Sequence, residues 1–175
     1  MKKILLVGLF VLLAGPALAQ SAGERTGVNS TLGITPKTTD FVNEAATSDM
    51  FEIQASKLAA GRTTGNVQAF ANQMVTDHTK TTSDLTGLAQ TAKLSLPTQM
   101  SSSQQKMLDK LRALKGKKFA KEYMDDQVSA HKQAVSLFQR YGKGGDNDAL
   151  KGWANQTLPT LQHHLDMAQG IYKNM

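Results

Sequence analysis

The chain has 175 residues, a formal net charge of +6 and no cysteine. This length suits one domain and is short for two, and the lack of cysteine excludes disulfides and thiol redox chemistry. The positive charge is mild, and no run of Lys and Arg interleaved with aromatic residues indicates a nucleic-acid surface. We therefore expect no nucleic-acid partner.

Residues 1–19 have the features of a secretory signal peptide. Lys2 and Lys3 precede a short apolar run, and an Ala-x-Ala cleavage signal ends at Ala19, just before Gln20. The apolar run is too short to span a bilayer comfortably, and no second run of membrane length follows. We expect a protein of the periplasm, or one secreted from the cell, without a transmembrane anchor after cleavage.

Residues 20–39 are rich in Gly, Ser, Thr and Asn and show no apolar periodicity. This composition predicts a flexible N-terminal tail. The folded domain is then expected at residues 40–175.

Four long segments carry apolar residues at three- and four-residue steps, which is typical of amphipathic helices. These helices are expected at residues 40–60, 66–93, 117–141 and 150–172. A short extra helix is expected at residues 102–114, because Ser102 followed by Gln105 matches a capping box. Short turns join the first and the last pair of long helices, and a longer connection joins the two pairs. This order predicts an all-α fold, an up-down four-helix bundle.

Three of the four histidines fall on the stripes predicted to be buried, each on a different helix. They are His78, His131 and His164, and Glu52 lies on the stripe of the remaining long helix. Four-helix bundles build metal sites by aiming such side chains inward from facing helices, and neutral imidazole is a common metal ligand. His163 points about 100° away from His164 and is expected to face outward.

Depth along the bundle axis leaves two interpretations open. If the four long helices alternate in direction, His78 and His131 are nearly level, with Glu52 about one turn above them and His164 about one turn below. The four side chains then form either one metal centre or a polar ladder that only fixes the packing of the helices.

The ligand pattern favours a mononuclear zinc or copper ion over a di-iron centre. Di-iron bundles carry a Glu-x-x-His motif on two helices, and the chain has none. Met74 and Met124 offer thioethers suited to copper, although methionines at helical spacing are more often core residues. No phosphate loop or nucleophile elbow is present, so no catalytic residue is predicted.

The densest basic patch consists of four lysines, which predicts at most a weak contact with an anionic surface of the cell envelope. They are Lys115, Lys117, Lys118 and Lys121. No protein partner is predicted.

Four segments together resemble a family of bacterial exported domains of unknown function, whose members are often labelled as membrane proteins. The segments are FVNEAATSDMFEIQASKLA (41–59), FANQMVTDHTK (70–80), FAKEYMDDQVSAHKQAVSLF (119–138) and LPTLQHHLDMA (158–168). The resemblance implies a ferritin-like four-helix fold, and it implies that the family's motif residues correspond to Glu52, His78, Tyr123, His131 and His164. The family has no settled activity, so its chemistry stays open.

Two functions follow as hypotheses. In the first, the buried His/Glu centre binds a metal ion and the protein serves envelope stress or metal handling. In the alternative, the protein is a non-enzymatic structural or interaction domain whose buried histidines only fix the packing of the helices.

Overall fold

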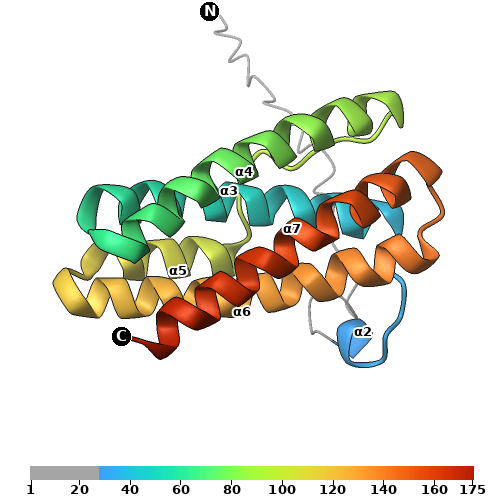
Figure 1. The fold of residues 1–175 in the computed structure, drawn as a ribbon. Helices are drawn as coiled ribbons and strands as arrows, with labels where there is room; N and C mark the ends of the chain where they lie inside the picture. Colours follow the sequence, from blue (N-terminus) through green and yellow to red (C-terminus); the bar gives the residue numbers. More distant parts are fainter. Residues whose placement is uncertain (1–27) are drawn as a thin grey trace, which may run out of the picture.

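The computed structural model describes residues 28–175, so the predicted signal peptide (1–19) and residues 20–27 lie outside the described part. The described residues form six helices and no strand (Figure 1), which confirms the predicted all-α class. The helices are α2 (Val28–Thr31), α3 (Thr38–Arg62), α4 (Gly65–Thr91), α5 (Ser102–Ala113), α6 (Gly116–Gly144) and α7 (Asp148–Lys173).

The four long helices and α5 begin and end within three residues of their expected bounds. The capping box of α5 lies one residue earlier than predicted: the Ser101 hydroxyl accepts from the Gln104 amide, and the Gln104 side chain accepts from the Ser101 amide. The run Ser101 to Gln105 fits the Ser-x-x-Gln pattern in two registers, so the local sequence does not choose between them. Burial of Leu108 and Leu111 accompanies the observed register.

Helix α2 was not expected from the sequence. The segment that contains it lies against the C-terminal half of α6 (Figure 1), where the Ser30 and Ser136 hydroxyls are hydrogen bonded at 2.8 Å. Arg140 donates to the Ile34 carbonyl at 2.6 Å. These bonds tie part of the N-terminal region to the bundle.

Helices α3, α4, α6 and α7 pack as a bundle around two hydrophobic clusters. The Phe41 cluster consists of Phe41, Val42, Ala45, Ala46, Leu85, Leu137, Phe138, Tyr141, Leu150, Trp153, Ala154 and Leu161. The Phe51 cluster consists of Phe51, Ala55, Ala59, Phe70, Ala71, Met74, Leu108, Leu111, Phe119, Tyr123, Met124 and Ala168.

The alternating order of helix directions assumed above is wrong. The N-terminal halves of α4 and α6 both contribute to the Phe51 cluster and their C-terminal halves to the Phe41 cluster, so these two helices run in the same direction. The cause is the long connection through α5, which returns the chain to the end where α4 began (Figure 1). Arg62, at the end of α3, accordingly donates to the carbonyls of Leu111 and Leu114 beside the start of α6.

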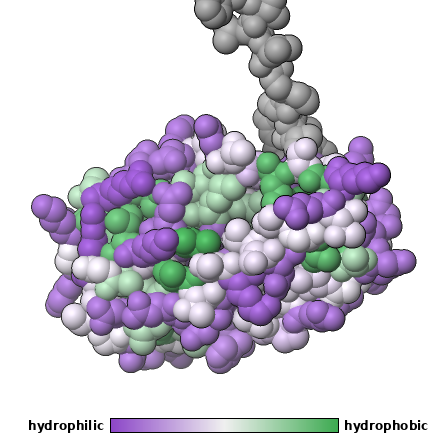
Figure 2. All heavy atoms as spheres, turned by 90° about the horizontal axis from the view of Figure 1, so that it is seen from above, coloured by the Kyte–Doolittle hydropathy of each residue, from purple (hydrophilic) through white to green (hydrophobic). Residues whose placement is uncertain are grey.

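Among residues 28–175, the exposed large hydrophobic residues are Leu32, Ile34 and Met175. Figure 2 shows one face on which hydrophilic side chains surround several separate apolar patches. Within residues 28–175, no helix combines the length and apolar character that crossing a membrane requires.

Candidate metal centre

The bundle brings His78 of α4, His131 of α6 and His164 of α7 together in one buried group, the histidine layer. Each of the three residues is at most 3% exposed, and the ring centroids lie 5.4 to 5.7 Å apart. One nitrogen from each ring lies within 4.8 Å of the other two. On each helix the histidine lies between residues of the Phe41 cluster and residues of the Phe51 cluster.

The helix directions place the three rings at similar depths in the bundle. His78 and His131 lie 13 and 15 residues after the starts of α4 and α6, and His164 lies nine residues before the end of α7. All three helix termini are at the same end of the bundle, so the rings differ in depth by about 9 Å or less before the helices tilt. The three side chains form one group rather than a ladder spread along the bundle axis.

Each ring uses one nitrogen as a hydrogen-bond donor to an acceptor, which fixes its tautomer. The acceptors are Asp49 Oδ1 for His78 Nδ1 (2.7 Å), the Gln127 carbonyl for His131 Nδ1 (3.0 Å) and Asp77 Oδ2 for His164 Nε2 (2.8 Å).

The second nitrogen of each ring is buried and has no hydrogen-bond partner among the described residues; these atoms are His78 Nε2, His131 Nε2 and His164 Nδ1. Buried polar atoms without a partner are uncommon, because losing water without a replacement bond costs free energy. Metal-binding histidines show this division, with one nitrogen oriented by a carboxylate or carbonyl and the other free to bind the ion.

The spacing suits one ion after a small contraction. Tetrahedral coordination at Zn–N distances of about 2.1 Å places two nitrogen ligands about 3.4 Å apart. Because the nitrogens lie within 4.8 Å of one another, each pair must close by about 1.4 Å or less. The three residues therefore form a group that could hold a metal ion.

Two of the rings are held in the neutral form that a ligand requires. Burial lowers the pKa of His131 to about 3, with a further contribution from the neighbouring His78 and His164. Burial also lowers the pKa of His164 to about 4, although the hydrogen bond to Asp77 opposes this change. Both rings therefore have their lone pairs available at neutral pH.

His78 differs because acidic side chains surround it. Burial by itself lowers its pKa, but the hydrogen bond to Asp49 and the charges of nearby carboxylates outweigh burial, so the pKa of His78 is raised. Burial raises the pKa of Glu52 to about 7, although the charge of His78 opposes the change. The site thus combines neutral rings with nearby carboxylates and is electrostatically suited to a cation.

Glu52 lies beside the histidine layer but is not part of the group of nitrogens within 4.8 Å. Its Oε2 accepts from Gln127 Nε2 at 2.7 Å, and its buried Oε1 has no hydrogen-bond partner among the described residues. Tyr123, the further residue implied by the family resemblance, is hydrogen bonded to Ser56 at 2.8 Å within the Phe51 cluster. Direct ligation by Glu52 stays a prediction.

Sequence reasoning missed the groups that orient the rings, Asp49 above all. Its Oδ2 accepts hydrogen bonds from the hydroxyls of Thr81 and Thr82 at 2.8 and 3.1 Å. The available signal was the threonine-rich segment inside α4, which is unfavourable for helix formation on its own and therefore needs a tertiary role.

The positions of His163, Met74 and Met124 agree with the sequence analysis. His163 is exposed, and Met74 and Met124 are buried members of the Phe51 cluster. The two methionines are thus core residues.

Comparison with known proteins identifies the family of the chain but does not indicate an activity. No curated protein matches the chain, and no solved structure matches it. A protein-family model described as a domain of unknown function (DUF4142) matches residues 23–171, and the chain belongs to this family.

Proposed function

We propose that this protein is an exported four-helix bundle that binds a single metal ion through His78, His131 and His164. The observation that carries the proposal is a buried group of three histidines, each with one ring nitrogen within 4.8 Å of the other two rings and one ring nitrogen without a hydrogen-bond partner. Each ring is held from its opposite side by an acceptor on the protein. In this site Glu52 supplies negative charge beside the ion, and it supplies a fourth ligand if its side chain turns inward.

Zinc or copper fits this donor set better than a di-iron centre. Three neutral imidazoles suit both zinc and copper, whereas di-iron bundles use several carboxylates as bridging and terminal ligands. A ferritin-like topology remains compatible with a single ion, because the site and not the fold decides the chemistry. The long connection through α5 supports that topology, since ferritin-like bundles contain one long crossover.

Export rests on the signal-peptide features of residues 1–19. A buried metal site in an exported protein suits metal handling or a response to envelope stress. No enzymatic reaction is part of this proposal.

The direct test is metal analysis of tag-free protein that has been stripped with a chelator and then offered zinc(II), copper(II) or iron(II). We expect one zinc or copper ion per chain, with nitrogen ligands in the X-ray absorption spectrum. His131→Ala should abolish this binding, and His163→Ala is the matched control because His163 is exposed. Two iron ions per chain, or equal metal content in the two variants, would overturn the proposal.

A structural or interaction domain is the second candidate. One observation favours it: His78 bonds Asp49 of α3, and His164 bonds Asp77 of α4, so two of the rings already link helices without an ion. If this is their whole role, replacing His78 should reduce stability equally in the presence and absence of metal. A loss of stability that appears only when metal is supplied favours the first proposal.

A further inference from the structure

One end of the bundle carries a basic surface that is separate from the histidine layer. The ends of α3, α5 and α7 and the starts of α4 and α6 lie at this end (Figure 1). We call residues 57–73, 108–122 and 167–175 the basic end. Its cations are all exposed, and they are Lys57, Arg62, Lys110, Arg112, Lys115, Lys117, Lys118, Lys121 and Lys173. The structure thus adds cations from α3, α5 and α7 to the four lysines that the sequence places near the start of α6.

The acidic side chains of the basic end are already paired. They are Asp109 and Glu122. Asp109 forms an ion pair with Arg112 at 2.9 Å, and Glu122 forms one with Lys110 at 2.5 Å. The other cations of the basic end form no ion pair with a described residue. The described part of the chain therefore leaves most of this positive charge without a partner.

The opposite end of the bundle carries both signs of charge. Asp40 lies in the first turn of α3, and Asp146 and Asp148 lie where α6 is followed by α7. Lys151 is paired with Asp148 at 3.1 Å. The excess positive charge of the described residues is therefore concentrated at the basic end.

The lysines at the start of α6 are not explained by helix stability. A cation is favourable in the last turn of a helix and unfavourable in the first, because the N-terminal end of the helix dipole is positive. The last turns of α3, α5 and α7 carry cations, as this effect favours. By contrast, Lys115 is the N-cap of α6, Lys117 and Lys118 lie in its first turn, and that turn contains no acid. An anionic partner would compensate this unfavourable placement.

The width of the basic end favours an extended anionic surface over a small anion. Arg62 belongs to α3, Lys117 to α6 and Lys173 to α7, and the axes of packed helices lie about 8–10 Å apart. A small anion contacts only a few of these side chains, whereas a bilayer with anionic headgroups can meet the whole end. Clusters of roughly four to eight Lys and Arg residues are typical of proteins that bind anionic lipids.

A nucleic acid fits the basic end less well. Binding of single strands usually includes stacking of bases on exposed aromatic side chains. Phe70 and Phe119 are buried, and Tyr172 is half-buried. The basic end thus offers charge with little aromatic surface.

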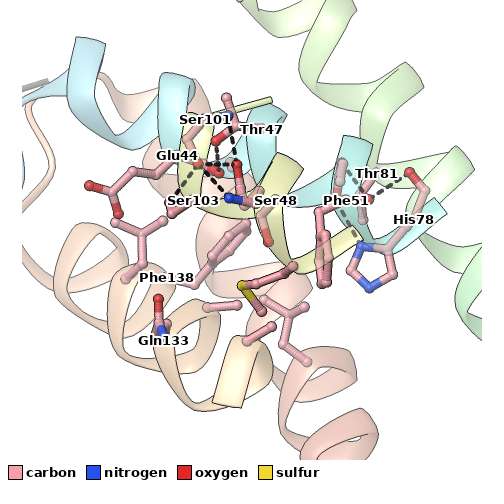
Figure 3. A pocket seen from close by; sticks show the side chains of 18 of the residues that line it. Glu44, Thr47, Ser48, Phe51, His78, Thr81, Ser101, Ser103, Gln133 and Phe138 are labelled. Carbon is pink, nitrogen blue, oxygen red and sulfur yellow. Dashed lines mark hydrogen bonds and ion pairs between the residues drawn. The ribbon is translucent and has the colours of Figure 1, made fainter. Parts of the chain in front are cut away.

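The largest cleft described in the structure lies outside the basic end. It has a volume of about 470 Å³, and Figure 3 shows Glu44, Ser101 and Gln133 among the side chains around it. No Lys or Arg is among the described residues that line it, and none of its lining residues belongs to the basic end. A surface that covers the basic end therefore leaves this cleft uncovered.

We propose that the basic end docks on a lipid bilayer that contains anionic lipids, with the lysines at the start of α6 against the headgroups. In this orientation α2 and the start of α3 face away from the bilayer. The inference does not depend on the proposed metal site, because His78, His131 and His164 lie outside the basic end.

The direct test is co-sedimentation of the chain from Gln20 to Met175 with lipid vesicles at low salt. We expect binding to vesicles made of equal parts of phosphatidylglycerol and phosphatidylcholine, and none to vesicles of phosphatidylcholine alone. About 1 M salt should release the protein, because the Debye length then falls to about 3 Å. Absence of binding to the anionic vesicles, or equal binding to both kinds, would overturn the proposal.

A charge-matched pair of variants tests the position of the contact. Replacing Lys115, Lys117 and Lys118 together by Gln should weaken binding to the anionic vesicles about 100-fold, because each cation near such a surface contributes about fivefold. The thermal unfolding midpoint should not fall, since these lysines lie where the helix dipole disfavours cations.

The control replaces Lys37, Lys132 and Lys143 together by Gln. These lysines are also exposed, lie outside the basic end and remove the same charge. The control should lose less than about threefold in affinity, since it keeps the cations that meet the headgroups. An equal loss in the two variants would show that net charge alone drives binding and would contradict the proposed docking surface.

A soluble polyanion distinguishes a lipid surface from a polysaccharide. Heparin and the anionic vesicles are compared at the same concentration of negative charge. Tighter binding to the vesicles than to heparin is expected. The reverse order would assign the basic end to an anionic polymer and overturn the lipid proposal, while leaving the proposed metal site untouched.

Discussion

The Phe41 cluster and the histidine layer are neighbours in the same bundle core, and the residues of both are buried. In the Phe41 cluster, Phe41 stacks on Tyr141 with ring centroids 3.9 Å apart and contacts Phe138 and Trp153 edge-on. In the histidine layer, the rings are held by single hydrogen bonds, and each keeps one unpartnered nitrogen.

This difference indicates that the Phe41 cluster mainly stabilises the fold, whereas the histidine layer is suited to binding. The Phe41 cluster stabilises the fold by burying apolar surface in close contact. In the histidine layer, one ring nitrogen of each histidine is buried without a hydrogen-bond partner. This lowers the stability of the fold unless a ligand binds there. A site that carries this cost beside a well-packed cluster is a candidate for binding.

The largest effect is expected in the Phe41 cluster. Phe41→Ala removes a fully buried ring and should lower the free energy of unfolding by about 3–5 kcal/mol, because lost contacts and a cavity both cost stability. Urea unfolding measures the change. Metal content per folded molecule should stay the same, and a loss of metal binding in this variant would show that the two regions are not separate.

His131→Ala tests the histidine layer. His131 bonds only the Gln127 carbonyl of its own helix, so the metal-free variant should remain folded. The unaltered protein should gain about 2.7 kcal/mol of stability at a metal concentration 100 times its Kd. The variant should gain none, as thermal unfolding with and without zinc would measure. A similar gain in both proteins would exclude His131 as a ligand.

Asp49→Asn tests the hydrogen bond that orients His78. Loss of such a partner typically lowers metal affinity about 10–100-fold, and competition with a chromogenic chelator measures it. Asp77→Asn should have the smaller effect, because Asp77 remains partly exposed, at 24% of its side chain, whereas Asp49 is at 9%. The reverse order would show that the bond to His164 matters more than the bond to His78.

The smallest effect concerns Asp126, a buried carboxylate outside the histidine layer. Burial, and then the charge of Glu122, raises the pKa of Asp126 from an ordinary 3.8 to about 7. An acid whose pKa rises on folding favours the folded state in its protonated form, so this contribution is lost as pH rises through about 7.

Asp126→Asn should therefore stabilise the protein above pH 7 by about 1 kcal/mol, a figure kept small because water and Lys110 screen the charge. Below pH 3.8 the two proteins should differ little. Urea unfolding at several pH values measures the difference, and metal affinity should not change. A pH-independent difference would mean that the charge of Asp126 is not its cause.

The sequence was sufficient to predict the four long helices, α5 and the histidines that face the core, but not α2. The spacing of apolar residues placed His78, His131 and His164 on buried stripes, and all three are buried. Helical periodicity is a local property, since each turn of the helix places side chains three and four residues apart on one face. For the same reason, the prediction that His163 faces outward is confirmed.

The sequence was not sufficient for the bonds that orient the rings. Asp49 and His78 are 29 residues apart, and Asp77 and His164 are 87 residues apart. Such pairs depend on how two helices are rotated and shifted against each other. The capping box of α5 shows the same dependence at a small scale, because Ser101 and Ser102 were equivalent until the helix packed.

The directions of the helices could not be predicted from the sequence and are known only from the tertiary structure. Local periodicity shows which face of each helix is buried, but it does not show at which end of the bundle a helix starts. The connection through α5 reverses the expected direction of α6 and α7, and the packing of the helices brings His78, His131 and His164 into one group. The three histidines of the candidate site could thus be predicted from the sequence, whereas their meeting in one group depends on packing between helices that are far apart in the chain.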